Sequence, residues 1–342
     1  MTLLYGRNWS RKQLLSYVGD LTQLAGWRLA ELSDGVERGN RVAEFRSGSG
    51  LSFNVMLDRG MDIGWAEYCG VPFSWISMVG FGAPSFFEPE GTGWLRTFGG
   101  GLLVGCGLTY LGSPGVDEGE EMGLHGRLSV TPASHVQFGE DWVDDECTFW
   151  INGQVRQARV FGENLLLKRE ITVGLGGSKM SLHDSVENLA DSSSPLMILY
   201  HINLGFPMLN ESCYLEAEPH TLSARDEDAD RGLENWHHFQ KPTIGYREQV
   251  FYHDLPANLD GWAHISLVNP DLGMKLILGY EKAGLPNLNQ WKMMGNNTYV
   301  LGLEPANCLV EGRQKERERG TLQFIKPGEK KDFRVEISVM KQ

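Results

Sequence analysis

The sequence predicts an all-β protein, a large antiparallel β-sandwich with one short N-terminal helix, on three observations. Segments in which apolar and polar residues alternate recur along the chain, as expected of half-buried strands. The 342 residues include 42 glycines, and turn-forming clusters separate the alternating segments. Only one segment has a convincing helical pattern. Many short strands with turns between them are typical of stacked antiparallel sheets.

The expected helix follows Ser10, which has the residue type of an N-cap. Gln13, three positions later, would complete a capping box. A short apolar face follows at Leu14, Leu15 and Val18, and Gly19 can end the helix.

The clearest strand pattern lies in residues 51–57, where apolar side chains occupy every second position. The same alternation occurs in residues 165–173 and 333–339. Shorter segments with strand character are 149–160, 195–204, 262–268, 274–280 and 297–303. Turn-rich stretches at 174–178 and 269–273 separate some of them.

We expect residues 1–342 to form a single domain, because no low-complexity linker and no internal repeat interrupts the pattern. Residues 1–47 would add the helix and a strand to its N-terminal side. The most polar insertion, residues 224–231, is expected to be a solvated loop, with a lid or a partner contact as the alternative.

The charge balance excludes several classes of partner. Asp and Glu number 44 against 31 Lys and Arg, a net charge of −13, which argues against binding to nucleic acid or to an anionic membrane. No apolar stretch reaches the roughly 20 residues of a membrane span, and the first residues lack the pattern of a signal peptide. We therefore expect a cytoplasmic protein. Five cysteines without a C-x-x-C pair indicate reduced thiols rather than disulfides or a zinc site.

Two histidines have contexts that favour chemistry. His125 lies between glycines, which allow a ligand to approach the main chain closely. Strand alternation places His201 and Asn203 on one face, at the end of an apolar strand. A buried histidine satisfied by a main-chain carbonyl would give the same pattern as His201. The functional alternative is a general acid, since an imidazole titrates near neutral pH.

Glu304 ends another strand, on the face that it shares with Gly302. Pro305, which follows, favours extended backbone there. A carboxylate beside so small a neighbour has room for a ligand. A solvated glutamate at a strand end is the alternative.

Further candidates come from charged and aromatic residues near turns. Arg96 precedes a glycine run and could donate hydrogen bonds to hydroxyl or carboxylate oxygens. That run lacks the residues of a nucleotide phosphate loop. Trp291 and Lys292 could supply an aromatic wall and a charge for a sugar, although a core tryptophan fits equally well. Residues 58–62 are expected to form a structural turn at the end of a strand, with ion pairs inside the turn.

Metal and covalent chemistry find little support in the sequence. His237, His238 and His253 lie near Glu234 and Asp254, but their spacing matches no defined ligand set. A G-x-S-x-G nucleophile elbow is absent. We therefore expect no metal and no cofactor.

The order Arg96, His125, His201 and Glu304 resembles the aldose 1-epimerase (galactose mutarotase) superfamily. The similarity is strongest to its branch of uncharacterised bacterial proteins grouped as a domain of unknown function. Family-like motifs occur at residues 57–63, 123–127, 200–207, 285–292 and 302–307, so the resemblance covers nearly the whole chain. It implies a β-supersandwich with a sugar cleft on one face.

The resemblance also implies roles for individual residues. Glu304 would be the general base and His201 the general acid, with a nearby Glu304 carboxylate keeping His201 charged. His125 and Arg96 would bind substrate. This chain has Arg127 where well-characterised galactose mutarotases have a second glycine, and it lacks their asparagine-arginine motif, which puts galactose specificity in doubt. A cluster of Arg96, Arg127 and Lys292 could attract an anionic sugar.

We therefore expect an isomerase that interconverts the anomers of a monosaccharide. One alternative is a sugar-binding or regulatory protein without turnover, and another is an epimerase acting at a different carbon of a keto sugar. The expected partner is the monosaccharide itself. A homodimer is one way to protect exposed sheet edges.

Overall fold

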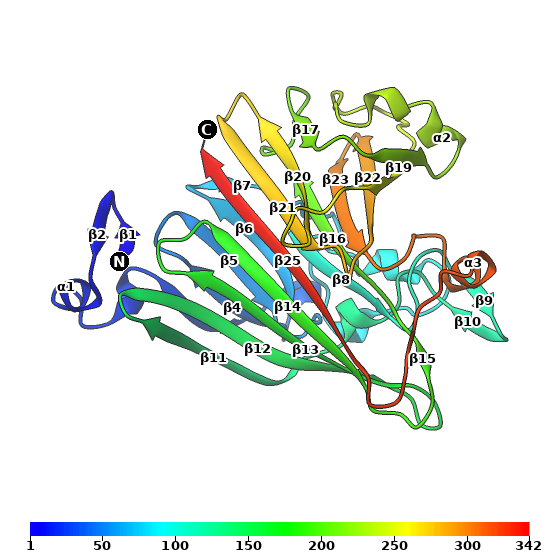
Figure 1. Ribbon diagram of the computed structural model, residues 1–342, viewed down its shortest axis with the longest axis horizontal. Coiled ribbons are helices and arrows are strands. Elements are labelled where there is room, and N and C mark those ends of the chain that lie inside the picture. The colour runs from blue at the N-terminus through cyan, green and yellow to red at the C-terminus, as the bar shows by residue number, and fades with distance from the viewer. Residues whose placement is uncertain (342) are drawn as a thin grey trace.

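Two β-sheets lie face to face in the computed structural model, which describes residues 1–341 (Figure 1). Neighbouring strands within each sheet run antiparallel. The smaller sheet has the order β11 (Ser134–Val143), β12 (Glu146–Ala158), β13 (Asn164–Gly174), β14 (Lys179–Asn188), β25 (Lys330–Lys341), β21 (Met274–Glu281), β20 (Trp262–Asn269) and β17 (Tyr214–Ala217).

The larger sheet carries the features discussed below. Its order is β18 (Thr221–Ala224), β19 (Gln249–Asp254), β22 (Asn287–Gly295), β23 (Thr298–Ala306), β16 (Met197–Gly205), β8 (Leu103–Leu108), β6 (Asp62–Tyr68), β5 (Leu51–Met56), β4 (Arg41–Arg46) and β3 (Gly26–Glu31), with β7 (Val71–Pro72) beside β6. Three two-stranded pairs complete the strands: β1 (Thr2–Leu4) with β2 (Arg7–Trp9), β9 (Gly115–Asp117) with β10 (Glu120–Met122), and β15 (Ser194–Pro195) with β24 (Phe324–Ile325).

The strands expected from alternation are confirmed, with shifts of a few residues at their ends. Residues 51–57 correspond to β5, residues 165–173 to β13 and residues 333–339 to β25. The five shorter predicted segments lie in β12, β16, β20, β21 and β23. The predicted sandwich class is thereby confirmed.

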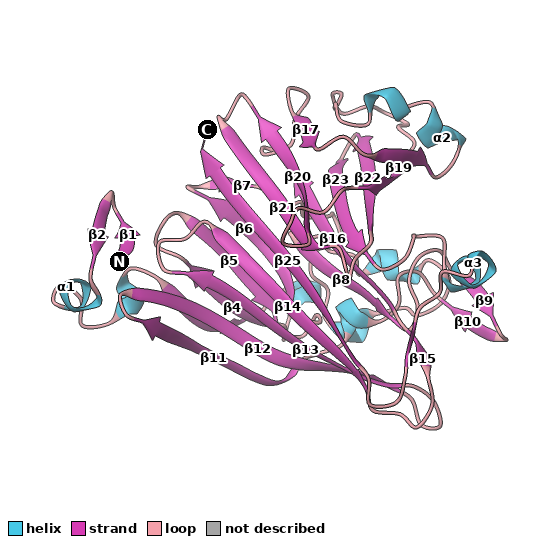
Figure 2. Cartoon of the chain, in the orientation of Figure 1, coloured by secondary structure: helices cyan, strands magenta, loops and turns pink. Residues whose placement is uncertain are grey.

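Helices are few and lie outside the two sheets (Figure 2). The predicted capping box is confirmed, because Ser10 and Gln13 each accept a hydrogen bond from the other's main-chain N–H. This helix, α1 (Arg11–Leu15), ends earlier than predicted, and Leu15 is exposed rather than part of an apolar face. Sequence reasoning missed α2 (Glu227–Asp230) and α3 (Arg313–Arg319).

Short 3₁₀ turns occur at Leu21–Gln23, Gly35–Glu37, Pro84–Phe86, Gly93–Arg96, Leu128–Val130 and Leu233–Asn235. Within residues 1–341, no helix is long and apolar enough to cross a membrane.

In the N-terminal part of the chain, β3 and β4 extend the edge of the larger sheet beyond β5.

The main core fills the space between the sheets and encloses one buried group of charges. Arg169 of β13 donates two hydrogen bonds to Asp184 of β14, at 2.9 and 2.7 Å. From the larger sheet, the Tyr200 hydroxyl donates to Asp184 at 2.8 Å, and Asp62 lies 3.5 Å from Arg169. This network joins the two sheets directly behind His201, the residue after Tyr200. It also shows that the turn at residues 58–62 pairs with other elements and is not self-contained.

Candidate active site

His201 and Glu304 lie opposite each other on adjacent strands of the larger sheet. The register of β16 and β23 places Ile202 opposite Leu303, which brings His201 level with Glu304. Side chains of directly opposed residues project from the same face of a sheet. His201 Nε2 lies 3.1 Å from Glu304 Oε1, and the two residues are only 5% and 3% exposed. Both predicted catalytic residues are therefore brought together.

Gly302 keeps the space beside this pair free. A Cβ atom at position 302 would lie 2.6 Å from Glu304 Oε1, 3.0 Å from Trp291 Cβ and 3.3 Å from His201 Cε1. The expectation of room beside Gly302 is confirmed, but the Glu304 carboxylate itself occupies part of that room. Any larger residue at position 302 would displace the carboxylate.

The loop that carries His125 is fixed by its glycines. A Cβ atom at Gly123 would lie 2.0 Å from the carbonyl oxygen of Pro89, and one at Gly126 would lie 2.5 Å from that of Gly107. Both positions therefore require glycine, and the loop can pack closely on β8. The His125 Nδ1 atom is buried and has no hydrogen-bond partner among residues 1–341.

Aromatic rings surround the two histidines. The His125 and His201 ring centroids are 6.2 Å apart. Trp94 contacts His125 edge-on at 4.8 Å, and Phe98 contacts His201 in the same way at 5.3 Å. Trp291, which was predicted as an aromatic wall, lies 5.5 Å from His201. These rings give the site apolar walls of the kind that line small-molecule sites.

Sequence reasoning missed two charged residues of the site. Arg225 donates a hydrogen bond to Glu248 at 3.0 Å, and Trp291 Nε1 donates to the other Glu248 oxygen at 2.8 Å. Arg225 lies in the polar segment 224–231, which was predicted to be a solvated loop and where strand alternation carries no information. Its next residue, Asp226, is instead the N-cap of α2.

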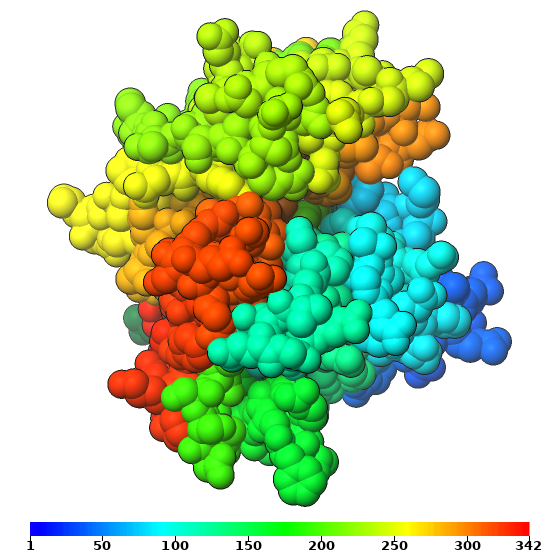
Figure 3. Space-filling view, turned by 90° about the vertical axis from the view of Figure 1, so that its right-hand side faces the viewer, coloured from blue at the N-terminus to red at the C-terminus, as the bar shows by residue number. Residues whose placement is uncertain are grey.

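Together these residues line a cavity of about 500 Å³. Its walls come from segments far apart in the chain, around residues 75–98, 113–125, 201, 225–250, 291–304 and 310. Figure 3 views the end of the molecule where the segment around residues 110–125 (teal) meets the α3 region (red-orange), with residues near 225–245 (lime) above them. This volume is within the usual range for small-molecule sites.

Burial controls the charges in this cavity. It raises the pKa of Glu304 to about 8, with nearby Glu248 acting in the same direction and Arg225 opposing it. Burial lowers the pKa of His201 to about 3 and that of His125 to about 4. A neutral imidazole beside a protonated carboxyl is therefore favoured at pH 7. The expectation that Glu304 keeps His201 charged is wrong for this buried pair, because desolvation outweighs their attraction.

Two predicted binding residues instead support the sheet. Asn203 donates hydrogen bonds to the main-chain carbonyls of Gly101 and His201, both at 3.0 Å, and it is fully buried outside the cavity lining. Lys292 donates to the carbonyl of Asn235 at 2.8 Å. Its neighbour Trp291 faces the cavity, and successive strand residues point to opposite faces, so Lys292 points away.

Arg96 also lies outside the cavity. The turn Gly93–Arg96 directs its side chain outward, where it is 74% exposed and pairs with Glu88 at 3.3 Å. Its neighbours Leu95 and Phe98 line the cavity instead. The prediction that Arg96 binds substrate is therefore corrected.

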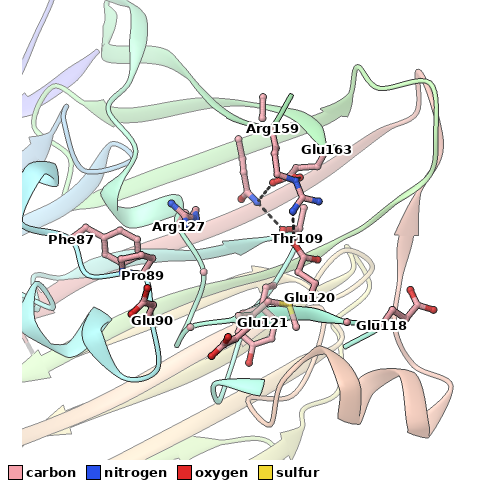
Figure 4. Close-up of a pocket in the computed structure, with 17 residues that line it drawn as sticks. Phe87, Pro89, Glu90, Thr109, Glu118, Glu120, Glu121, Arg127, Arg159 and Glu163 are labelled. Atoms are coloured by element: carbon pink, nitrogen blue, oxygen red, sulfur yellow. Dashed lines mark hydrogen bonds and ion pairs between the residues drawn. The ribbon is translucent and has the colours of Figure 1, made fainter. Parts of the chain in front are cut away.

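Arg127 lines a different and larger cavity of about 890 Å³ (Figure 4). Its guanidinium lies over the ring of Phe87, 5.7 Å from the centroid. The other arginine of this cavity, Arg159, pairs with Glu120 at 3.2 Å and with Glu163 at 3.3 Å. Neither His201 nor Glu304 reaches this cavity, so size alone does not identify the site. The proposed cationic cluster of Arg96, Arg127 and Lys292 is not formed.

Within residues 1–341, no group of three or more His, Cys, Asp or Glu side chains is arranged to hold a metal ion. His253, one of the histidines considered in the sequence, contacts His220 at 2.8 Å and Gln290 at 2.9 Å.

Comparison with known proteins places this architecture in a family. The sequence profile described as "Domain of unknown function (DUF4432)" matches residues 37–339. The chain belongs to this family. No curated protein matches the sequence.

Solved structures extend the comparison. A Klebsiella pneumoniae protein, named in its structure as a "putative aldose 1-epimerase", superposes on the DUF4432 chain with a TM-score of 0.88 and 27% identity, covering 92% of this chain and 83% of that one. A galactose mutarotase-like protein from Clostridium acetobutylicum gives a TM-score of 0.63 at 12% identity, covering 94% and 100%. The galactose 1-epimerase of Lactobacillus acidophilus gives a TM-score of 0.58 at 13% identity, covering 93% of this chain and 99% of that one.

The last two similarities show the fold alone. The predicted resemblance to the aldose 1-epimerase superfamily is confirmed by the family match and by the structural similarity. The supersandwich that it implied is also confirmed.

Proposed function

We propose that this DUF4432 protein is an isomerase that interconverts the α and β anomers of a monosaccharide. The observation that carries the proposal is the buried contact between His201 Nε2 and Glu304 Oε1, 3.1 Å apart, in a cavity walled by aromatic rings. Opening a cyclic hemiacetal requires removal of the anomeric hydroxyl proton while the ring oxygen receives one. Two adjacent groups that share a single proton meet this requirement.

The proton balance of the pair supports this assignment. The favoured neutral state holds one proton, on Glu304. When a substrate hydroxyl donates a hydrogen bond to Glu304, it stabilises the carboxylate and allows this proton to move to His201. Glu304 then takes the anomeric proton, His201 protonates the ring oxygen, and the C1–O5 bond breaks.

This step returns the pair to its neutral state, with an open-chain aldehyde in the cavity. Rotation about the C1–C2 bond presents the other face of the carbonyl. The ring oxygen then gives its proton to His201 while it attacks C1, and Glu304 protonates the new anomeric oxygen. No proton is gained or lost over the cycle.

The remaining cavity residues would bind and orient the sugar. His125 projects its ring beside that of His201, with centroids 6.2 Å apart, so it can contact a hydroxyl near the reacting carbon. Trp291 and Phe98 provide apolar surfaces for the C–H faces of the ring. Asn203 would act as a positioning residue, because it holds the main chain at His201.

The test is exchange NMR between the α and β forms of a panel of sugars, followed through the anomeric protons of aldoses and the anomeric carbons of ketoses. We expect the wild-type protein to accelerate exchange for at least one sugar. His201→Asn and Glu304→Gln should lower the catalysed rate by about 10²–10⁴-fold. Thermal unfolding of each variant shows whether the fold is retained. Binding without acceleration by the wild-type protein would instead indicate a sugar-binding protein without turnover.

A further inference from the structure

Several polar groups of the active-site cavity are already occupied by protein partners. Ser77 Oγ donates a hydrogen bond to the carbonyl of Phe98 at 2.6 Å, and Trp94 Nε1 donates to Ser129 Oγ at 3.2 Å. A substrate hydroxyl could use these groups only by breaking an existing hydrogen bond. They therefore add little to the recognition of hydroxyl groups.

The same holds for the charged groups at the side of the cavity. Arg225 is held between Asp226 at 2.8 Å and Glu248 at 3.0 Å. Both oxygens of Glu248 are used, because the second accepts from Trp291 Nε1. Two carboxylates thus surround one guanidinium, and the charge left over is negative. An anionic substituent placed here would meet repulsion.

No other lining residue within the described part of the chain supplies a positive charge. The remaining titratable groups of the cavity are Glu304, His125 and His201. Burial lowers the pKa values of both histidines, so they are neutral at pH 7. The titratable groups that can face a substrate are thus concentrated at the reacting end, around Glu304 and His125, and the hydroxyls of Ser113 and Thr298 complete the polar part of the lining.

Apolar side chains form most of the rest of the lining: Trp75, Met78, Val79, Leu95, Phe98, Leu124, Val250 and Val310. A sugar hydroxyl buried against these apolar side chains loses its hydrogen bonds to water and finds no partner on them. A methyl or methylene group at the same place is stabilised by burial. The cavity therefore favours a sugar with fewer hydroxyls than a hexose.

We propose that the cavity selects uncharged deoxy sugars, and that Glu248 is the residue that excludes anionic ones. This inference rests on the proposed function for its reaction, but the selectivity follows from the lining itself. Asp226 already pairs with Arg225, the only arginine or lysine in the lining of the described chain, and Glu248 adds the second carboxylate that makes this side of the cavity negative.

The experiment compares a hexose, its 6-deoxy form and its uronate in each of the glucose, galactose and mannose series. Binding is measured by saturation-transfer NMR and turnover by anomer exchange. In the sugar series whose members bind and react, we expect kcat/KM for the 6-deoxy sugar to exceed that of the parent hexose by about 10-fold to 100-fold. The uronate should be the poorest of the three.

These readouts separate the two proposals. If no sugar exchanges faster, the proposed function fails, while the binding order still tests the selectivity. If the parent hexose or the uronate binds and reacts as well as the 6-deoxy sugar in every series, the selectivity proposal is overturned.

A pair of matched variants tests the role of Glu248. Glu248→Gln keeps an oxygen that can accept from Trp291 but removes the excess negative charge beside Arg225, which Asp226 still pairs. We expect the preference for the 6-deoxy sugar over the uronate to fall by roughly 10-fold. Glu88→Gln, which breaks the exposed ion pair with Arg96 outside the cavity, is the control and should leave the preference unchanged. An unchanged preference in Glu248→Gln would refute the role assigned to Glu248.

Discussion

Gly302→Ala tests the geometry of the site with a single added carbon. The new Cβ would lie 2.6 Å from Glu304 Oε1 and 3.0 Å from Trp291 Cβ. Both distances are well inside van der Waals contact, and Trp291 is held by its hydrogen bond to Glu248. The Glu304 carboxylate is the group that can move, and moving it breaks the 3.1 Å contact with His201.

The expected result is a loss of turnover much larger than any loss of stability. Separation of the acid and the base removes a contribution of about 10²–10⁴ to the rate. Main-chain strain is small, because Gly302 lies within β23 and has ordinary extended geometry. Anomer-exchange NMR measures the rate, and urea unfolding measures stability.

Gly174→Ala is the matched control, since Gly174 also lies in a strand and its Cβ would meet no atom within 4 Å. This variant should exchange anomers at the wild-type rate. Wild-type turnover in Gly302→Ala would refute the assignment of Glu304 as a catalytic group in this position.

The remaining predictions concern charge and stability. Burial raises the pKa of Glu304 to about 8, so kcat/KM should fall as the pH rises through about 8 and the pair loses its proton. A fall in kcat/KM that already begins near pH 5 would contradict a protonated Glu304 beside a neutral His201. Removing the charge of Glu248 should move the fall in kcat/KM to lower pH, since that charge raises the pKa of Glu304. Arg96→Ala should leave the exchange rate unchanged, and a large loss would restore the role predicted from the sequence. Asp184→Asn removes the closer carboxylate of the buried Arg169 and leaves only Asp62, 3.5 Å away, so it should destabilise the fold by about 3–5 kcal/mol in urea unfolding. A loss below about 1 kcal/mol would show that the network is dispensable.

Strand alternation explains how much of the site could be predicted. It correctly placed His201 and Glu304 on sheet faces, and the family resemblance implied that the two residues act together. The same rule could have excluded Lys292, because it follows Trp291 directly and must point the other way. Asn203 shares the face of His201, but its amide is used by main-chain carbonyls that only the folded structure reveals.

Residues outside strands could not be placed in this way. Arg225 and Arg96 both lie next to short turns, where the direction of a side chain depends on the tertiary packing of the turn. Arg225 follows β18 and turns toward Glu248, whereas Arg96 ends a 3₁₀ turn and faces solvent. The charge state of the Glu304 and His201 pair was mispredicted for a related reason, because burial depends on all the segments that enclose it.

The most direct test of the account is anomer exchange in D₂O, comparing wild-type protein with Glu304→Gln on the sugar that binds best. We predict that the wild-type protein accelerates exchange while every C–H bond of the sugar is retained, and that the variant loses this acceleration but binds the sugar. Deuterium entering a C–H position would show an epimerase that acts at another carbon. Acceleration by Glu304→Gln equal to that of the wild-type protein would contradict the central claim that Glu304 and His201 open the sugar ring.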